Sequence, residues 1–100
     1  METQPTFAVF RTRGPAWDNS KPMRQQDNWD AHAQFMDNLV NTGFIILGGP
    51  LTDGPDVLLI ISAENEQQIR QTLSNDPWEP AELLITQQIH PWTILLDSLS

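Results

Sequence analysis

Short apolar stretches punctuated by turn residues predict four β-strands. Residues 6–13 (TFAVFRTR) are rich in β-branched and aromatic side chains and end before Gly14-Pro15, which predicts the first strand. The stretches FIILGG (44–49) and VLLIIS (57–62) flank the turn-forming segment 50–56 and predict an antiparallel hairpin. The last strand is expected over 83–96.

Two other stretches have the spacing of helices. From Asp27 to Gly43, apolar side chains recur every three or four residues, with Asp27 or Asn28 available as a cap and Gly43 as the terminating residue. The second helix is expected to begin at Asn65, with Gln68 in the position of a capping-box partner, and to stop near Asp76. It stops there because the residue before a proline is pushed out of the helical region.

The resulting order is β-α-β-β-α-β, which predicts an α+β, ferredoxin-like fold with a four-stranded antiparallel sheet. Two helices can cover only one face of such a sheet. The runs FIIL and VLLII are nevertheless apolar at consecutive positions, which is typical of strands covered on both faces. A second copy of the sheet would supply the missing layer, so we expect a homodimer that packs face to face as a dimeric α/β barrel.

Composition excludes several classes of function. The net charge of −8 disfavours nucleic acid as a partner. No apolar run approaches the ~20 residues of a membrane span, and the N-terminus lacks the pattern of a signal peptide, so a cytoplasmic protein without a membrane partner is expected. With no cysteine and two histidines, no metal site is expected. The segment GGPLTDGP lacks the features of a phosphate loop, and no cofactor is indicated.

Two ionisable residues are candidates for chemistry. His32 lies on the apolar stripe of the first predicted helix, where it is either a general acid/base or a core histidine with satisfied hydrogen bonds. Asp76 opens the tetrapeptide DPWE, in which it can cap a short turn with Glu79 as its reciprocal partner. Capping leaves a second carboxylate oxygen free to orient a histidine.

Substrate binding has three further candidates. Arg11 and Arg13 are two residues apart on the first strand and must point to the same side. They could bind a small anionic metabolite, pair with acidic side chains, or mark a solvated strand end. The long loop GPAWDNSKPMRQQ (14–26) follows them, and ordered loops of this length are often functional. Trp78 is either a core anchor or part of a ligand-binding wall.

The segments WDAHAQFMDNLVNTGFIILGGPL, SNDPW and IHPWTILL together resemble the YCII-related (YciI-like) family. The resemblance covers nearly the whole chain, and it implies a single domain over residues 1–100 that dimerises as an α/β barrel. It also implies that His32 and Asp76 meet in a cleft as an active-site pair, with Gly48-Gly49-Pro50 matching the family's hairpin. The chain departs from the family where EPAELL follows the tryptophan, at a position where relatives often have a glycine.

Two functions are compatible with this pattern. In the first, the chain is a small-molecule lyase or isomerase in which His32 transfers protons, Asp76 fixes its tautomer, and Arg11, Arg13 and Trp78 bind the substrate. In the second, the chain is a non-catalytic dimer that binds a metabolite or another protein, and the His32–Asp76 contact is structural.

Overall fold

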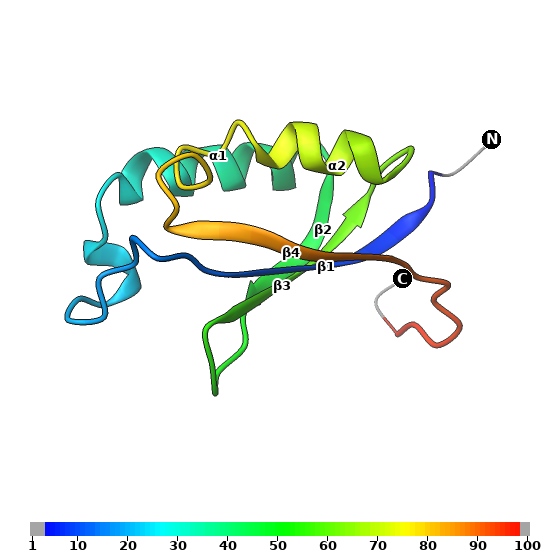
Figure 1. The fold of residues 1–100 in the computed structure, drawn as a ribbon. Coiled ribbons are helices and arrows are strands. Elements are labelled where there is room, and N and C mark those ends of the chain that lie inside the picture. Colours follow the sequence, from blue (N-terminus) through cyan, green and yellow to red (C-terminus); the bar gives the residue numbers. More distant parts are fainter. Residues whose placement is uncertain (1–3, 99–100) are drawn as a thin grey trace.

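A computed structural model describes residues 4–98 of the chain. One four-stranded antiparallel sheet carries two helices on one of its faces (Figure 1). The strand order is β2-β3-β1-β4. No helix within the described residues is long and apolar enough to cross a membrane. In chain order the elements are β1 (Thr6–Arg13), the short 3-10 helix η1 (Met23–Gln25), α1 (Trp29–Asn41), β2 (Ile45–Pro50), β3 (Asp56–Ser62), α2 (Glu66–Leu73) and β4 (Leu84–Pro91).

The helix ends follow the expected chemistry with small differences. α1 begins at Trp29, and Asn28 occupies the cap position in a left-handed conformation without a side-chain hydrogen bond. Gly43 follows the helix at a φ of 83°, where a glycine is favoured. At α2, Asn65 Oδ1 accepts a hydrogen bond from the backbone N–H of Gln68 at 2.8 Å, and the Gln68 side chain accepts one from the backbone of residue 64.

β4 is shorter than predicted. It ends at Pro91 instead of continuing to residue 96, because its neighbour β1 begins at Thr6 and offers no partner beyond that point. Directly after β4, the backbone N–H of Trp92 still donates a 2.8 Å hydrogen bond to the carbonyl of Thr6 at the start of β1. The prediction that Pro91 requires an edge position or a bulge is confirmed: β4 is an edge strand, and its pairing with β1 shifts register once, between Phe10 and Arg11.

The main core lies between the sheet and the helices. Val9 and Ile61 from the sheet pack with Ile69 and Leu73 of α2, and all four are fully buried. A second cluster is built around Trp78, with Trp17 from the long loop and Leu83-Leu84 at the start of β4. This second cluster fixes the loop and the turn that surround the candidate site.

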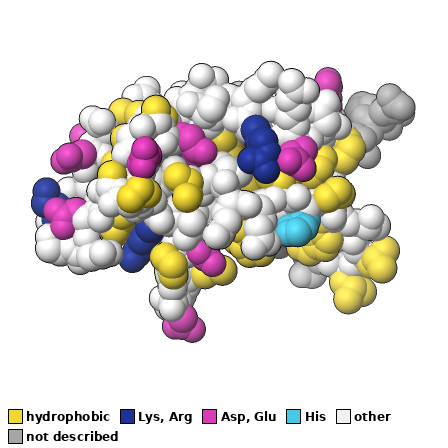
Figure 2. Space-filling model, in the orientation of Figure 1, with side chains coloured by type: hydrophobic (Ala, Val, Ile, Leu, Met, Phe, Trp, Pro, Cys, Tyr) yellow, Lys and Arg dark blue, Asp and Glu magenta, His cyan; other side chains and the backbone are white. Residues whose placement is uncertain are grey.

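The other face of the sheet is also apolar. Strand pairing and side-chain alternation place Ala8 and Phe10 of β1 beside Ile60 and Leu58 of β3 on the face that carries no helix. The space-filling view shows hydrophobic side chains gathered below the sheet, around the C-terminal segment (Figure 2). The apolar runs of the sequence therefore do supply both faces of the sheet.

We predict that Gly48 is required for the close approach of β2 to β3. A Cβ atom at Gly48 would lie 2.6 Å from Leu59 Cδ2 and 2.9 Å from the backbone oxygen of Leu58, and that oxygen cannot move without distorting the strand. Gly48→Ala should lower the free energy of unfolding by about 1–3 kcal/mol, as overpacking usually does. Gly54→Ala is the control, because a Cβ atom there meets nothing within 4 Å. Equal stability of the two variants in urea titrations would contradict the prediction.

Candidate active site

The structure brings His32 and Asp76 together. His32 projects from α1, and its Nδ1 lies 2.9 Å from each carboxylate oxygen of Asp76, which sits in the turn between α2 and β4. The Asp76 side chain is fully buried, and that of His32 is 8% exposed. A neutral imidazole that donates its Nδ1 proton to a carboxylate carries its lone pair on Nε2. Nε2 is therefore the atom that can exchange protons.

The turn holds Asp76 through its own backbone. The N–H of Trp78 donates to Asp76 Oδ1 at 2.9 Å, so the carboxylate caps the turn and contacts the histidine at the same time. The two roles anticipated for Asp76 are thus compatible. Glu79, expected as a reciprocal capping partner, instead directs its carboxylate toward Arg11.

Arg11 is an interior residue of the site. It is completely buried, and it donates from Nη1 to Asp76 Oδ2 at 2.8 Å and from Nη2 to Glu79 Oε2 at 2.6 Å. The other Glu79 oxygen accepts from the backbone N–H of Thr86 at 3.3 Å. Arg11 therefore forms ion pairs, which was one of its expected roles. Sequence reasoning missed Glu79 as its partner, although an arginine on the inward face of a strand does require a buried acid.

The surroundings of Asp76 act on its pKa in opposite directions. Burial alone would raise the pKa of this carboxyl group, but hydrogen bonds from His32, from the backbone of Trp78 and from Arg11 together outweigh that effect. The pKa of Asp76 is consequently held below its usual value of 3.8. Asp76 is an anion at neutral pH and can stabilise a positive charge on the imidazole.

Trp78 forms a wall behind the histidine. Its ring stacks on His32 with centroids 3.8 Å apart and planes 5° from parallel. Its indole N–H donates to the backbone oxygen of Asp27 at 2.6 Å, which fixes the ring. Trp78 is fully buried, so it acts on the site by covering one face of the imidazole and holding its orientation.

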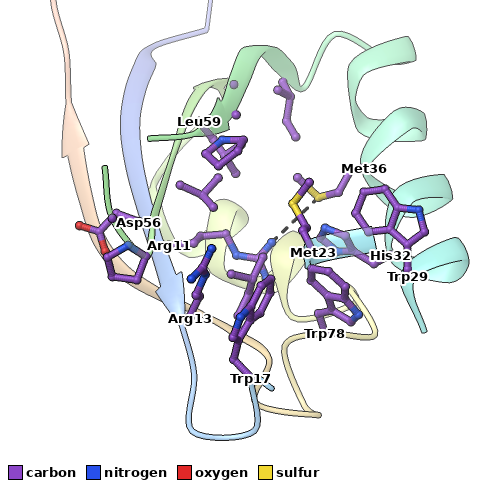
Figure 3. Close-up of a pocket in the computed structure, with 18 of the residues that line it drawn as sticks. Arg11, Arg13, Trp17, Met23, Trp29, His32, Met36, Asp56, Leu59 and Trp78 are labelled. Atoms are coloured by element: carbon purple, nitrogen blue, oxygen red, sulfur yellow. Dashed lines mark hydrogen bonds between the residues drawn. The ribbon is translucent and has the colours of Figure 1, made fainter. Parts of the chain in front are cut away.

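A cavity of about 250 Å³ adjoins the histidine (Figure 3). Its walls combine aromatic and sulfur-containing side chains with a few charged ones. Arg11 reaches into this region from the sheet, and its Nη1 lies 4.0 Å from the sulfur of Met36. The chief lining residues besides His32 are Arg11, Arg13, Trp17, Met23, Trp29, Met36, Asp37, Asp56 and Trp78.

The long loop contributes to the cavity because one buried glutamine holds it in place. The Gln26 amide accepts from the backbone N–H of Asp18 and donates to the carbonyls of Asp18 and Lys21, over distances of 2.7–3.0 Å. Trp17 and Met23 are thereby placed in the wall. No feature of the sequence had singled out Gln26.

Arg13 lies near the cavity in a different environment from Arg11. Its guanidinium carbon lies 4.5 Å above the ring of Trp17, and its side chain is exposed. Among residues 4–98, no carboxylate lies within ion-pair distance of Arg13. Its in-plane N–H groups can therefore bind an incoming anion.

No group of three or more histidine, cysteine, aspartate or glutamate side chains within the described part of the chain could hold a metal ion. The chemistry that the described side chains provide is proton transfer in a partly enclosed, aromatic cavity.

Comparisons with known proteins give one informative result. Neither the models of known protein families nor the sequences of characterised proteins produce a significant match. Among solved structures, the chain matches 5-chloro-2-hydroxyhydroquinone dehydrochlorinase (TftG) from Burkholderia phenoliruptrix, in complex with 2,5-dihydroxybenzoquinone. The match has a TM-score of 0.66 and 26% sequence identity, and it covers 88% of this chain and 93% of that protein. This likeness confirms the ferredoxin-like fold.

We predict that Asp76 stabilises the folded state in a pH-dependent way. Because its folded-state pKa is depressed, its contribution is fully present above the unfolded value of 3.8 and is lost as the pH falls through the folded value. Wild type should exceed Asp76→Asn in free energy of unfolding near pH 7, and the difference should shrink below about pH 4. Urea titrations across this range provide the measurement. A difference that stays constant down to about pH 2 would contradict the prediction.

Proposed function

We propose that the chain is a member of the YCII-related family and acts as a lyase or isomerase on a small ring-shaped metabolite. The supporting observation is the His32 ring, which lines a cavity while its Nδ1 is bonded to a buried, ionised carboxylate. This arrangement prepares Nε2 to accept a proton.

The proposed reaction begins when Nε2 removes a proton from a substrate hydroxyl group, or from a carbon next to a carbonyl group. Asp76 stabilises the imidazolium that forms, because the carboxylate remains ionised. In a lyase, the electron pair left on the substrate expels a leaving group. In an isomerase, the imidazolium returns the proton to another atom of the substrate. Both routes balance without an oxidant or reductant.

The character of the cavity supports an oxygenated aromatic or quinone-type ring as the substrate. Its walls contain Trp17, Trp29 and two methionines, which suit a flat ring. TftG, which has the same fold, is described as a dehydrochlorinase and was solved with a dihydroxybenzoquinone. Arg13 is the proposed contact for an anionic oxygen of the substrate. In this proposal Arg11 holds Asp76 in position through their ion pair, and Trp78 holds the orientation of the His32 ring by stacking on it.

We further propose that the chain forms a homodimer through the face of the sheet that carries no helix. Phe10 and Leu58 on this face are only partly buried, and Ile85 remains 37% exposed. A second sheet packed on this face would remove the apolar surface from water and would complete the dimeric α/β barrel.

The alternative function is a non-catalytic binding module. It is favoured by one observation: the His32–Asp76 contact joins α1 to the turn before β4 and so can serve stability alone. In that case His32→Ala should lower the free energy of unfolding by about 1–3 kcal/mol, because the buried Asp76 carboxylate loses one of its hydrogen-bond donors, and ligand binding should persist.

We predict that the two candidate residues control turnover. 5-Chloro-2-hydroxyhydroquinone is the first substrate to test, with chloride release as the assay and 2,5-dihydroxybenzoquinone as the probe for binding. His32→Ala and Asp76→Asn should each reduce turnover by about 10²–10⁴-fold, the usual contribution of acid–base catalysis. Gln71→Ala is the control, because Gln71 is exposed on α2 and lies outside both the cavity and the proposed interface. Unchanged turnover in folded His32→Ala and Asp76→Asn would contradict the mechanism.

We predict that the protein in solution has about twice the 11.4 kDa mass of one chain. Light scattering at micromolar concentration measures this mass. Leu58→Asp should shift the mass toward that of a monomer, because it places a charge on the proposed interface. Gln71→Asp is a control on an exposed position of α2. A wild-type monomer with an intact fold would contradict the dimer.

A further inference from the structure

Four side chains of the site form one continuous chain of contacts. His32 is bonded to Asp76, Asp76 to Arg11, and Arg11 to Glu79. With a neutral imidazole, one arginine faces two carboxylates and the formal charges sum to −1. With an imidazolium, the sum is zero. The group of four is thus electrically balanced only in the state that follows proton uptake by His32.

We propose that Glu79 is a positioning residue for proton transfer, which acts on His32 through Arg11. Without the negative charge of Glu79, the pair of Arg11 and Asp76 would already be neutral. A proton on the imidazole would then add an uncompensated positive charge to a buried site. With it, the positive charge of Arg11 is shared between two carboxylates, and Asp76 keeps negative charge available for the imidazolium. This inference rests on the proposed function, since it assigns Glu79 a part in the chemistry of His32.

The geometry indicates that the Arg11 guanidinium is shared between Asp76 and Glu79 and does not pair with Asp76 alone. The contact from Arg11 to Glu79, at 2.6 Å, is shorter than its contact to Asp76, at 2.8 Å. The guanidinium and Asp76 are completely buried and the Glu79 side chain is 24% exposed, so water screens the contact to Glu79 in part and the contact to Asp76 very little. The Glu79 carboxylate is fixed on its other side by the backbone of Thr86 in β4. It therefore cannot swing away from Arg11 without losing a second hydrogen bond.

Other charged groups near the cavity are less able to exert this effect. Asp37 of α1 is exposed, so its influence is screened by water. Asp56 at the start of β3 and Arg13 at the end of β1 also line the cavity, but neither contacts Asp76 or Arg11 through a hydrogen bond or ion pair. Asp76, Arg11 and Glu79 are thus the charged groups linked by direct contacts to the ring.

The test is a proton NMR titration of the imidazole ring, which requires no substrate. The chain has two histidines, and His90→Gln assigns the remaining Hε1 signal to His32. Glu79→Gln preserves the shape of the side chain and removes its charge. The midpoint of the His32 titration should move to lower pH by about 0.5–1 unit, the size expected for loss of a nearby opposite charge that is partly screened. Arg11→Gln should move the midpoint in the opposite direction.

The control is Glu82→Gln, which removes an exposed carboxylate three residues away and should leave the midpoint unchanged. Glu79→Asp keeps the charge and should restore much of the wild-type behaviour. A Glu79→Gln midpoint equal to that of wild type would overturn the inference. Shifts of the same sign in Glu79→Gln and Arg11→Gln would also overturn it, because loss of local structure would move both midpoints toward the value of an unfolded chain. Loss of turnover in His32→Ala is independent of these outcomes, so failure of this inference and failure of the proposed function remain distinguishable.

Discussion

The buried ion pair between Arg11 and Asp76 is the constraint on which the site depends. It ties the middle of β1 to a turn more than sixty residues later in the chain, and both side chains are fully excluded from solvent. Replacing such a pair with apolar side chains is often neutral for stability, whereas removing one partner leaves a buried charge and is strongly destabilising. Loss of either partner is therefore expected to destabilise the fold, and the pair restricts the turn to the arrangement in which Arg11 and Asp76 are in contact. That arrangement brings the Asp76 carboxylate to His32.

The two faces of the sheet differ in what covers them. The face beneath the helices holds the core at one end and the cavity at the other, where Arg11 replaces the apolar residues that precede it along β1. The opposite face is apolar without a covering layer in one chain. The site is thereby formed within one subunit, while the proposed association uses a surface that does not contribute to it.

The sequence predicted the elements and their order because the relevant signals are local. β1 has the predicted bounds, and Gly43 ends α1 in the conformation that its position indicated. The predicted end of β4 was wrong because the length of a strand depends on where its neighbouring strand ends. A local sequence pattern carries no information about that neighbour. At the site, His32 was recognised because a histidine on an apolar stripe requires a partner. Glu79 and Gln26 were missed because their partners are set by packing, and local capping explained Glu79 equally well.

The tripeptide that begins with Asp76 shows why the carboxylate is placed in a turn. In the interior of a helix, the backbone N–H two residues after Asp76 would already donate to the carbonyl four residues before it. The Asp76 carboxylate could then not accept a hydrogen bond from that N–H. In the turn, the N–H of Trp78 is available and holds Oδ1, which leaves Oδ2 to Arg11 and both oxygens within reach of His32. The same short connection brings the Trp78 ring flat against the imidazole. One local conformation thus fixes the position of the carboxylate and the plane of the ring that it orients, and a single turn determines the geometry of the proposed proton transfer.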